Sequence, residues 1–218
     1  MTWVLKFGTN VMIFRFPDKP IETSRAFLDT VDESKWIAQC KYDGWRLQIY
    51  KHNGKIDLLT RVGNQIDKKT AFPESLKREI DIILMNCPDN TVLDSEFVGP
   101  RGNHVPTIYL FDLLAYNGNW LCNVPFCDRW EKITSDHQLL YYACGVHNIK
   151  LAKTRDWGFA AMFDNLKADW IKNGNQMDLH EGIVLKRKAG TLVLNPQKSV
   201  DSQHMLKCKY RDIRGKRF

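Results

Sequence analysis

The chain lacks the glycine-rich patterns with which many proteins bind nucleotides. Neither GxxxxGK[ST] nor GxGxxG occurs in its 218 residues. If the protein binds a nucleotide, the phosphates must therefore be held by side-chain cations rather than by a glycine-rich backbone loop.

Signals for membrane insertion, secretion and structural zinc are absent as well. The sequence has no run of about 18 apolar residues, and its first residues lack a basic segment followed by a long apolar core. The cysteines are scattered without a CxxC pair, which argues against zinc and favours a reducing, intracellular compartment, the cytoplasm. We therefore expect no membrane contact.

Positive charge is concentrated near the C-terminal end. The chain carries 32 Lys and Arg against 25 Asp and Glu, a net charge of +7. Residues 186–218 alone hold ten bases and two acids. Such a surplus is typical of a surface that contacts a phosphate backbone, and the alternative is a solvated basic tail. The candidate nucleic-acid contacts in this segment are Arg211, Arg214, Lys216 and Arg217.

Hydrophobic periodicity predicts strands with interspersed helices. Alternation around Gly44 indicates extended segments over 36–50, and a turn at 52–54 leads into a strand over 56–60. Helical spacing predicts helices over 73–87 and 159–170, the second ended by Gly174. Further strands are expected over 91–98, 107–115, 183–185, 192–194 and 205–209. Hairpins without regular βαβ units predict an α+β fold with mainly antiparallel sheets.

The most informative stretch is the hexapeptide KYDGWR at positions 41–46. An amine is nucleophilic only when unprotonated, a state that neighbouring cations and desolvation favour. The pattern marks Lys41 as a candidate nucleophile, and Gly44 allows the backbone to approach a ligand closely. A surface hairpin with ordinary charges is the alternative reading of this stretch alone.

Carboxylates and cations recur downstream in an order that suits a nucleotide. Glu96 follows one apolar strand and Glu181 precedes another, and such oxygen ligands suit Mg²⁺. Lys207 and Lys209 lie two residues apart on a predicted strand, so both ammonium groups can reach one polyphosphate. Each residue taken singly is compatible with a solvated surface, and the ordered set is what indicates a site.

Taken together, these segments resemble the covalent nucleotidyltransferase superfamily, and within it the ATP-dependent DNA ligases. The matching segments, which run from about residue 36 to residue 211, are KxDGxR at 41–46, DSE at 94–96, FD at 111–112, EGIVLK at 181–186 and KCK at 207–209. Ser95 departs from the family, which usually has glycine there. The resemblance implies a nucleotidyltransferase (ATP-grasp-like) fold, with mainly antiparallel sheets and flanking helices around a nucleotide cleft.

The resemblance also implies a role for each matching residue. It makes Lys41 the residue that is adenylylated by ATP, and Glu181 with Glu96 the candidate ligands of Mg²⁺ or Mn²⁺. The residues that it assigns to the nucleotide are Arg46, Glu96, Phe111, Lys186, Lys207 and Lys209. Arg61 resembles, more loosely, the arginine that binds the 5′-phosphate at a nick.

A ligase of this kind transfers AMP to the 5′-phosphate of a nicked strand and then joins that strand to a 3′-hydroxyl. The expected partner is nicked double-stranded nucleic acid, DNA or an RNA-containing duplex, bound by a monomer. Residues 1–218 are expected to form one adenylation domain without an OB-fold or an N-terminal DNA-binding domain. The alternatives are an RNA or hybrid ligase, a GTP-dependent mRNA capping guanylyltransferase, and a basic nucleic-acid-binding module without activity.

Overall fold

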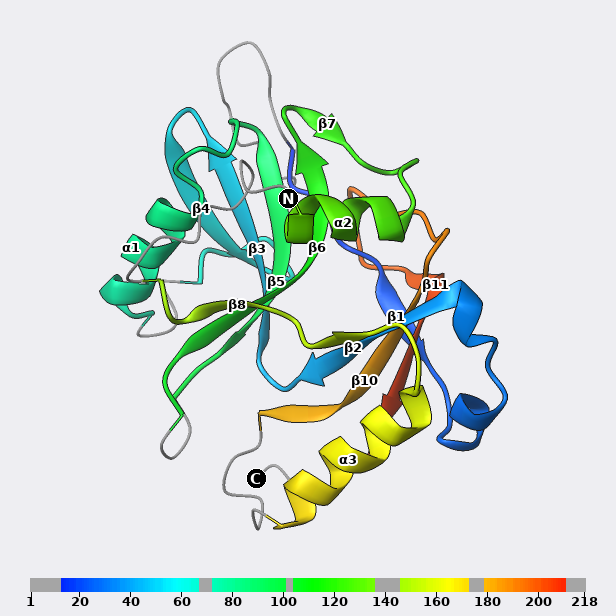
Figure 1. Ribbon diagram of the computed structural model, residues 1–218. Helices are drawn as coiled ribbons and strands as arrows, with labels where there is room; N and C mark the ends of the chain where they lie inside the picture. The colour runs from blue at the N-terminus through cyan, green and yellow to red at the C-terminus, as the bar shows by residue number, and fades with distance from the viewer. Residues whose placement is uncertain (1–12, 67–71, 101–103, 136–145, 173–178, 211–218) are drawn as a thin grey trace.

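Two β-sheets form the frame of the molecule (Figure 1). The computed structural model describes residues 13–66, 72–100, 104–135, 146–172 and 179–210. The strands of the first sheet are, in spatial order, β1 (Lys19–Glu22), β11 (Asp201–Lys209), β10 (His180–Arg187), β2 (Trp36–Tyr42) and β9 (Thr154–Arg155). The second sheet contains β4 (Lys55–Thr60), β3 (Trp45–His52), β5 (Thr91–Val98), β6 (Thr107–Tyr116) and β7 (Asn119–Trp120), with β8 (Ile149–Leu151) paired to β6.

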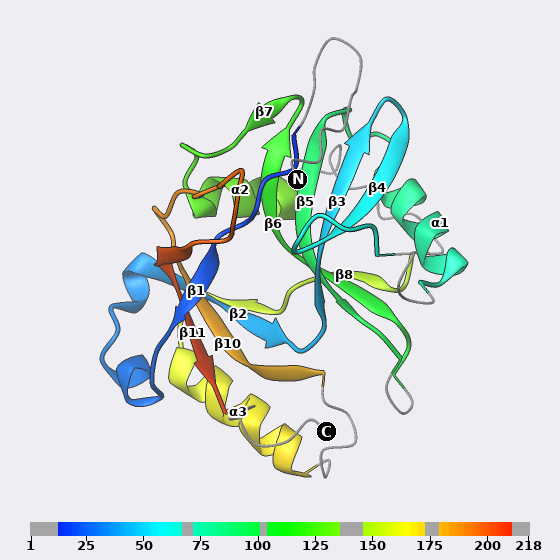
Figure 2. The ribbon, with the colours of Figure 1, turned by 180° about the vertical axis from the view of Figure 1, so that it is seen from behind.

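Most of the strand pairs are antiparallel. Among the described strands, only β1 with β11 and β6 with β8 run parallel. In the described part of the chain, the helices α1 (Glu74–Ile83), α2 (Phe126–Ser135) and α3 (Phe159–Lys172) lie against the sheets, as Figures 1 and 2 show. Two short 3₁₀ helices, Ala26–Asp29 and Glu33–Lys35, precede β2. The predicted α+β class with mainly antiparallel sheets is confirmed.

The chain passes from the first sheet to the second within the KYDGWR hexapeptide. Strand β2 ends at Tyr42 and β3 begins at Trp45, so only Asp43 and Gly44 lie between the sheets. A Cβ atom at position 44 would lie 2.3 Å from the carbonyl oxygen of Phe97 on β5, which is far inside van der Waals contact. Glycine at this position therefore allows β3 to turn away from β2 and still pair with β5.

Side-chain alternation along the strands separates the apolar core residues from the polar residues of the candidate site. On β2, Trp36 and Ala38 pack in an apolar cluster that includes residues of α3, whereas Gln39 and Lys41 line the opposite face. On β3, Leu47 belongs to the apolar cluster beneath α1. Because successive side chains of a strand point to opposite faces, burying the apolar set against the helices leaves the polar set facing the space between the sheets.

One predicted strand is wrong. Residues 192–194 form no strand, although a single bridge joins Asn195 to Phe16 just beyond them. The preceding carbonyls of Lys188 and Gly190 instead accept hydrogen bonds from backbone N–H groups at the start of α2. The first N–H groups of a helix have no partner within the helix, so this segment serves α2 rather than a sheet.

The other predicted elements are present with different ends. The expected strand over 205–209 is the second half of β11, and the expected helix over 73–87 ends earlier, at Ile83. The predicted elements do not include α2, β1 or the short strands β7, β8 and β9. The proposed cap at Gly174 lies outside the described residues.

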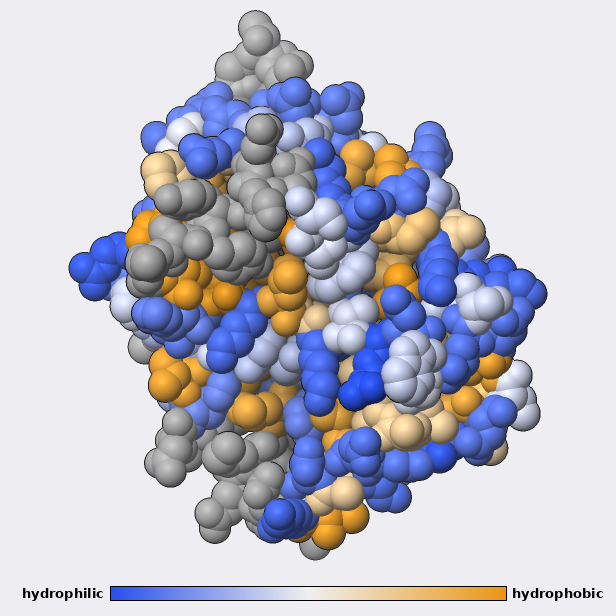
Figure 3. Space-filling view, in the orientation of Figure 1, coloured by the Kyte–Doolittle hydropathy of each residue, from blue (hydrophilic) through white to orange (hydrophobic). Residues whose placement is uncertain are grey.

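Apolar side chains are mostly withdrawn from the surface. The face drawn in Figure 3 is mainly hydrophilic, and its apolar residues form small, separated groups. Within the described ranges, no helix combines the length and the apolar character that crossing a membrane requires.

A buried carboxylate on α1 fixes the segment that leads into β8. Glu79 accepts hydrogen bonds from the backbone N–H groups of His147 (3.0 Å) and Asn148 (2.7 Å). It also accepts one from the side-chain amide of Asn148, at 2.8 Å. The position of β8 at the edge of the second sheet thus depends on one side chain of α1.

We expect Glu79→Ala to lower the free energy of unfolding by about 2–3 kcal/mol, because donors in a partly buried site lose their acceptor. Asp81→Ala, at an exposed position of the same helix, should change it by less than about 0.5 kcal/mol. Urea denaturation of the two variants measures the difference. Equal losses would show that Glu79 does not hold this segment.

Candidate active site

Two lysines share one buried carboxylate at the end of the first sheet. The Nζ atom of Lys41 contacts Oε1 of Glu181, and the Nζ atom of Lys209 lies 3.2 Å from the same oxygen. The Glu181 side chain is buried, whereas both lysine side chains are partly exposed. Two cations balanced by a single carboxylate leave a net positive charge at this point.

A β-bulge places Glu181 at the lysines. In the pairing of β10 with β2, the register shifts between His180 and Gly182, so Glu181 is an extra residue on β10. Such a bulge changes the direction of a side chain locally. Gly182 has φ 150°, and a Cβ atom there would lie 2.0 Å from the carbonyl oxygen of Cys208. The bulge therefore depends on a glycine directly after Glu181.

Glu96 on β5 lies against the junction between the sheets. Its Oε1 atom accepts a hydrogen bond from the backbone N–H of Gly44, at 3.0 Å. Burial raises the pKa of this carboxyl from its ordinary 4.5 to about 7, although the charges of Lys41 and Arg46 oppose the change. Glu96 thus changes its charge near neutral pH, close to the candidate nucleophile.

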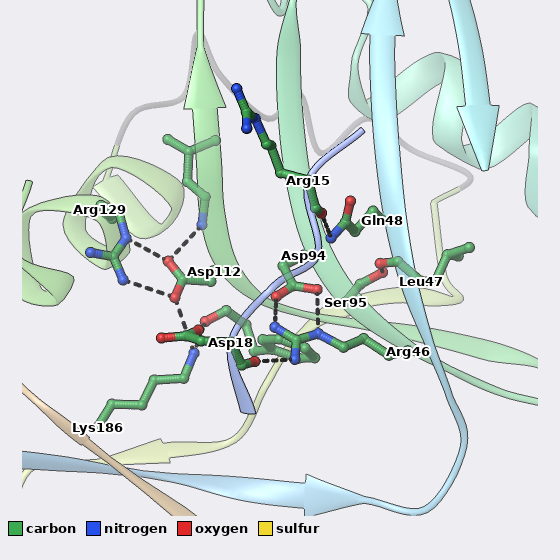
Figure 4. Close-up of polar contacts among 12 residues, drawn as sticks. Arg15, Asp18, Arg46, Leu47, Gln48, Asp94, Ser95, Asp112, Arg129 and Lys186 are labelled. Atoms are coloured by element: carbon green, nitrogen blue, oxygen red, sulfur yellow. Dashed lines mark hydrogen bonds and ion pairs between the residues drawn. The ribbon is translucent and has the colours of Figure 1, made fainter. Parts of the chain in front are cut away.

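Two bidentate ion pairs fix the guanidinium groups of the site (Figure 4). Arg46 binds the carboxylate of Asp94 through two N–H groups and donates to the backbone carbonyl of Asp18, at 2.7 Å. Arg129, from α2, binds both carboxylate oxygens of Asp112, at 2.8 and 3.0 Å. The paired donors of a guanidinium fit a carboxylate in one plane, so each arginine has little freedom to turn.

Lys186 extends the second ion pair towards Phe111. Its Nζ atom lies 3.3 Å from Asp112 and donates to the Phe111 carbonyl at 2.8 Å. Burial lowers the pKa of Lys186. Burial would raise the pKa of Asp112, but the charges of Lys186 and Arg129 outweigh it and hold that pKa below the ordinary range. The group remains an ion pair in a buried position.

The ring of Phe111 lies among these cations. Nζ of Lys186 is 4.9 Å from the ring centroid, and the guanidinium carbon of Arg46 is 5.7 Å away. Both distances lie within the range of cation–π attraction. The hydrogen bond from Nζ of Lys186 to the backbone carbonyl of Phe111 and these ring contacts together hold Phe111 in place.

A single cavity of about 500 Å³ brings the predicted residues together. It is lined by every described residue that the sequence assigned to nucleotide or nick: Lys41, Arg46, Arg61, Glu96, Phe111, Lys186, Lys207 and Lys209. Glu181 is not part of the lining and meets the cavity only through its two lysines. The four C-terminal basic residues lie outside the described part of the chain. The volume is in the range of small-molecule sites.

Gln39 is a cavity residue that no motif indicates. Both polar atoms of its side-chain amide are buried, and within the described part of the chain neither has a hydrogen-bond partner. Buried polar atoms without a partner are rare in proteins and call for an explanation, such as a ligand. Strand alternation is the available sequence signal, because it places Gln39 on the same face of β2 as Lys41. Arg129, by contrast, has no sequence signal at all.

The carboxylates of the site fit a magnesium ion that is shared with phosphates. The second oxygen of Glu181, Oε2, is buried and has no hydrogen-bond partner among the described residues. The same residues contain no group of three His, Cys, Asp or Glu placed to hold a metal by themselves. Mg²⁺ usually binds one or two carboxylates together with substrate phosphates and water, so Glu181 and Glu96 suit it.

Comparison with known proteins shows that this site is similar to that of ATP-dependent ligases. Residues 19–106 match the family described as ATP dependent DNA ligase domain. The matched residues include the KYDGWR hexapeptide and Glu96. Over 142 residues it is 27% identical to the SPbeta prophage-derived DNA ligase-like protein LigB of Bacillus subtilis (strain 168), a match that covers 56% of this chain and 49% of LigB. The chain thus spans about half the length of that relative.

Solved structures confirm the nucleotidyltransferase fold of the ligases. The ligase domain of LigD from M. tuberculosis superposes with a TM-score of 0.62 at 19% identity, covering 90% of this chain and 59% of that one. An archaeal ATP-dependent RNA ligase superposes with a TM-score of 0.56 at 14% identity, covering 93% and 50%. At such identities the likeness establishes the fold and leaves the nucleic-acid substrate open.

The raised pKa of Glu96 makes the stability of the protein depend on pH. In the unfolded chain the carboxyl ionises near 4.5, and in the folded protein near 7. The folded protein therefore binds the carboxyl proton more tightly than the unfolded chain does. The stabilisation of the folded state that results is complete below about pH 4.5 and is lost as the pH rises through 7. Glu96→Gln removes it, so the variant should gain about 2 kcal/mol relative to wild type between about pH 5 and about pH 8.

Denaturant unfolding at the two pH values measures this change. Glu131→Gln, which alters an exposed carboxylate on α2, is the matched control and should follow the wild type. A constant difference between Glu96→Gln and wild type at both pH values would show that Glu96 ionises normally.

Proposed function

We propose that the chain is an ATP-dependent polynucleotide ligase that seals 3′-hydroxyl/5′-phosphate nicks in duplex nucleic acid, with DNA as the favoured substrate, through AMP bound to Lys41. The observation that carries the proposal is the Lys41 ammonium at the cavity, held with Lys209 on one oxygen of Glu181. The family match supports it, because residues 19–106 include Lys41, Arg46 and Glu96.

The cavity offers a separate surface to each part of ATP. The partly buried ring of Phe111 provides a flat apolar face for a purine. The amide of Gln39 provides one donor group and one acceptor for the polar edge of the base. Lys207 and Lys209 point from β11 to the cavity and supply point charges for the phosphates.

In the first step, Nζ of Lys41 forms a bond to the α-phosphorus of ATP while the bond to the pyrophosphate oxygen breaks. Nζ must lose a proton for this attack, and the Glu181 carboxylate, already in contact with it, is an acceptor within reach. Lys209 remains on the same oxygen and stabilises negative charge as it develops on the phosphate. When bound beside Glu181 and Glu96, Mg²⁺ would further neutralise phosphate charge.

The two later steps use the same positioning. The 5′-phosphate at the nick attacks the phosphorus of the lysyl-AMP and releases Nζ, so AMP becomes attached to the nucleic acid. The 3′-hydroxyl then attacks the activated 5′-phosphate and AMP leaves. Holding the two strand ends in line with the leaving group is the main requirement of both steps.

A ligase for RNA or hybrid duplexes is the second candidate, favoured by the structural likeness to an archaeal RNA ligase. End-joining on a matched panel of nicked DNA, nicked RNA and mixed duplexes separates the candidates. Joining of RNA nicks alone would replace DNA as the proposed substrate. Labelling by GTP instead of ATP would favour a guanylyltransferase.

Incubation with ATP and Mg²⁺ should add one AMP to the wild-type protein and none to Lys41→Ala, because Lys41 is the lysine of the KYDGWR hexapeptide, lines the cavity and contacts Glu181. Lys150→Ala, an exposed lysine on β8, is the matched control and should label fully. Intact-mass measurement reads the adduct. Undiminished labelling of Lys41→Ala would show that another residue is the nucleophile.

Arg61→Gln should weaken binding to a nicked DNA duplex and reduce the slope of log affinity against log salt by about 0.9, the value for one phosphate contact. AMP labelling should persist, since this side chain lies at the turn after β4. Arg155→Gln alters an exposed arginine on β9 outside the cavity and serves as control. If both variants keep the wild-type salt slope, Arg61 does not contact phosphate.

A further inference from the structure

A small apolar surface lies at the mouth of the cavity, where β3 begins and β4 ends. Trp45 is 53% exposed and Val62 is 56% exposed, and both belong to the cavity lining. The register of β3 with β4 places Thr60 opposite Leu47, so the turn that carries Val62 follows at the end of the sheet where Trp45 lies. None of the steps of AMP transfer proposed above uses Trp45.

The indole of Trp45 is supported from behind. In the ladder Trp45 lies opposite Phe97 of β5, and the two ring centroids are 6.0 Å apart. Phe97 is only 2% exposed and packs on Phe72, at 4.7 Å. The interior of the second sheet thus holds one side of the indole, while about half of its surface remains open to solvent.

A cation lies beside this apolar surface. Arg61 precedes Val62 in a turn that two backbone hydrogen bonds close, from Gly63 to Thr60 and from Thr60 to Asn64. Within the described residues, the Arg61 guanidinium has no ion pair or hydrogen bond. The cavity lining as a whole contains seven Lys or Arg and three acids, so its field attracts a polyanion.

These features favour a nucleobase over a protein as the occupant. A stable protein interface buries roughly 800 Å² on each partner, far more than two exposed side chains offer. A nucleic-acid strand presents a flat ring of the size of an indole next to a phosphate, which matches an aromatic face beside a guanidinium. In an intact duplex, the neighbouring bases cover both faces of each base. At an interruption of the strand, one face of the terminal base can become accessible.

We propose that Trp45 is a stacking platform for a nucleobase at the interruption of the nucleic-acid strand. This inference deepens the ligase function proposed above and rests on it. Trp45 holds the base beside the break, while Arg61 holds the adjoining phosphate, so the strand end is oriented towards Lys41. Recognition of the break is thereby assigned to a residue that the attack on ATP does not require.

The test compares binding to a nicked duplex with binding to the same duplex without the nick. The nick carries a 3′-deoxy end, so that no joining occurs during the measurement. Trp45→Leu keeps an apolar side chain against Phe97 but removes the flat ring, and Trp45→Phe keeps a ring. Trp157→Leu removes a tryptophan that is 68% exposed and does not line the cavity, which makes it the matched control.

We expect Trp45→Leu to lose at least about fivefold in affinity for the nicked duplex and much less for the intact one. Trp45→Phe and Trp157→Leu should stay within about twofold of wild type, and the salt slope of all variants should be unchanged, because stacking releases no counterions. Thermal melting of each variant verifies that it is folded.

Several results would overturn the proposal: an equal loss of both duplexes in Trp45→Leu, no loss at all, no recovery in Trp45→Phe, or a wild type without preference for the nick. A change in sedimentation without a change in nick binding would assign Trp45 to contacts between protein molecules instead. AMP labelling by ATP alone separates this inference from the proposed function. If wild type fails to label, the ligase function fails, whereas normal labelling of Trp45→Leu with impaired nick binding supports both.

Discussion

The short link between the two sheets is the constraint on which the rest of the structure depends. With only Asp43 and Gly44 between β2 and β3, the strand that carries Lys41 and the strand that carries Arg46 cannot move independently. Gly44 lies so close to the Phe97 carbonyl that a side chain would separate β3 from β5. The cavity between the sheets is therefore a consequence of backbone geometry, and the side chains line a space that the backbone has already set.

The charged residues in and around the cavity form two kinds of ion pair. Arg46 and Arg129 are fixed by bidentate carboxylates, and their orientation serves the architecture of the site. Lys41 and Lys209, by contrast, share one oxygen of Glu181, so neither has a full counter-ion. An incoming phosphate meets rigid walls and an incompletely neutralised centre, which is the arrangement that favours binding of an anion without a large rearrangement.

Much of this site could be predicted from the sequence, because its residues are tied to short patterns. KYDGWR, Glu96 next to an apolar strand and the KCK alternation correctly place Lys41, Arg46, Glu96, Lys207 and Lys209 at the cavity. The fold class also follows from hairpins and strand periods. Partners that meet only in three dimensions could not be predicted. Arg129 reaches Asp112 from α2, a helix that is not among the predicted elements, and the bulge at Glu181 is a register shift that no local pattern predicts.

Residues 192–194 show the opposite limitation. Their apolar character resembles that of a strand, yet the carbonyls just before them bind the start of α2. A local pattern says that a segment is apolar, but it does not say which neighbour will use its backbone groups. Whether such a segment joins a sheet is decided by tertiary structure.

The pairing register of β10 decides whether Glu181 reaches Lys41 and Lys209. Gly182 lies opposite Lys41 on one side and Lys209 on the other, and the bulge allows only this alignment to present Glu181 to both. A slip by one residue would exchange the two faces of the strand, turning Lys186 towards α3 and Ile183 towards the cavity. Such a molecule would retain sheets and helices, but Lys41, the proposed nucleophile, would lose its counter-ion. If Lys41 accepts AMP as proposed, the labelled fraction of a refolded sample would measure how many chains have correctly aligned strands, which spectroscopic measures of secondary structure do not distinguish.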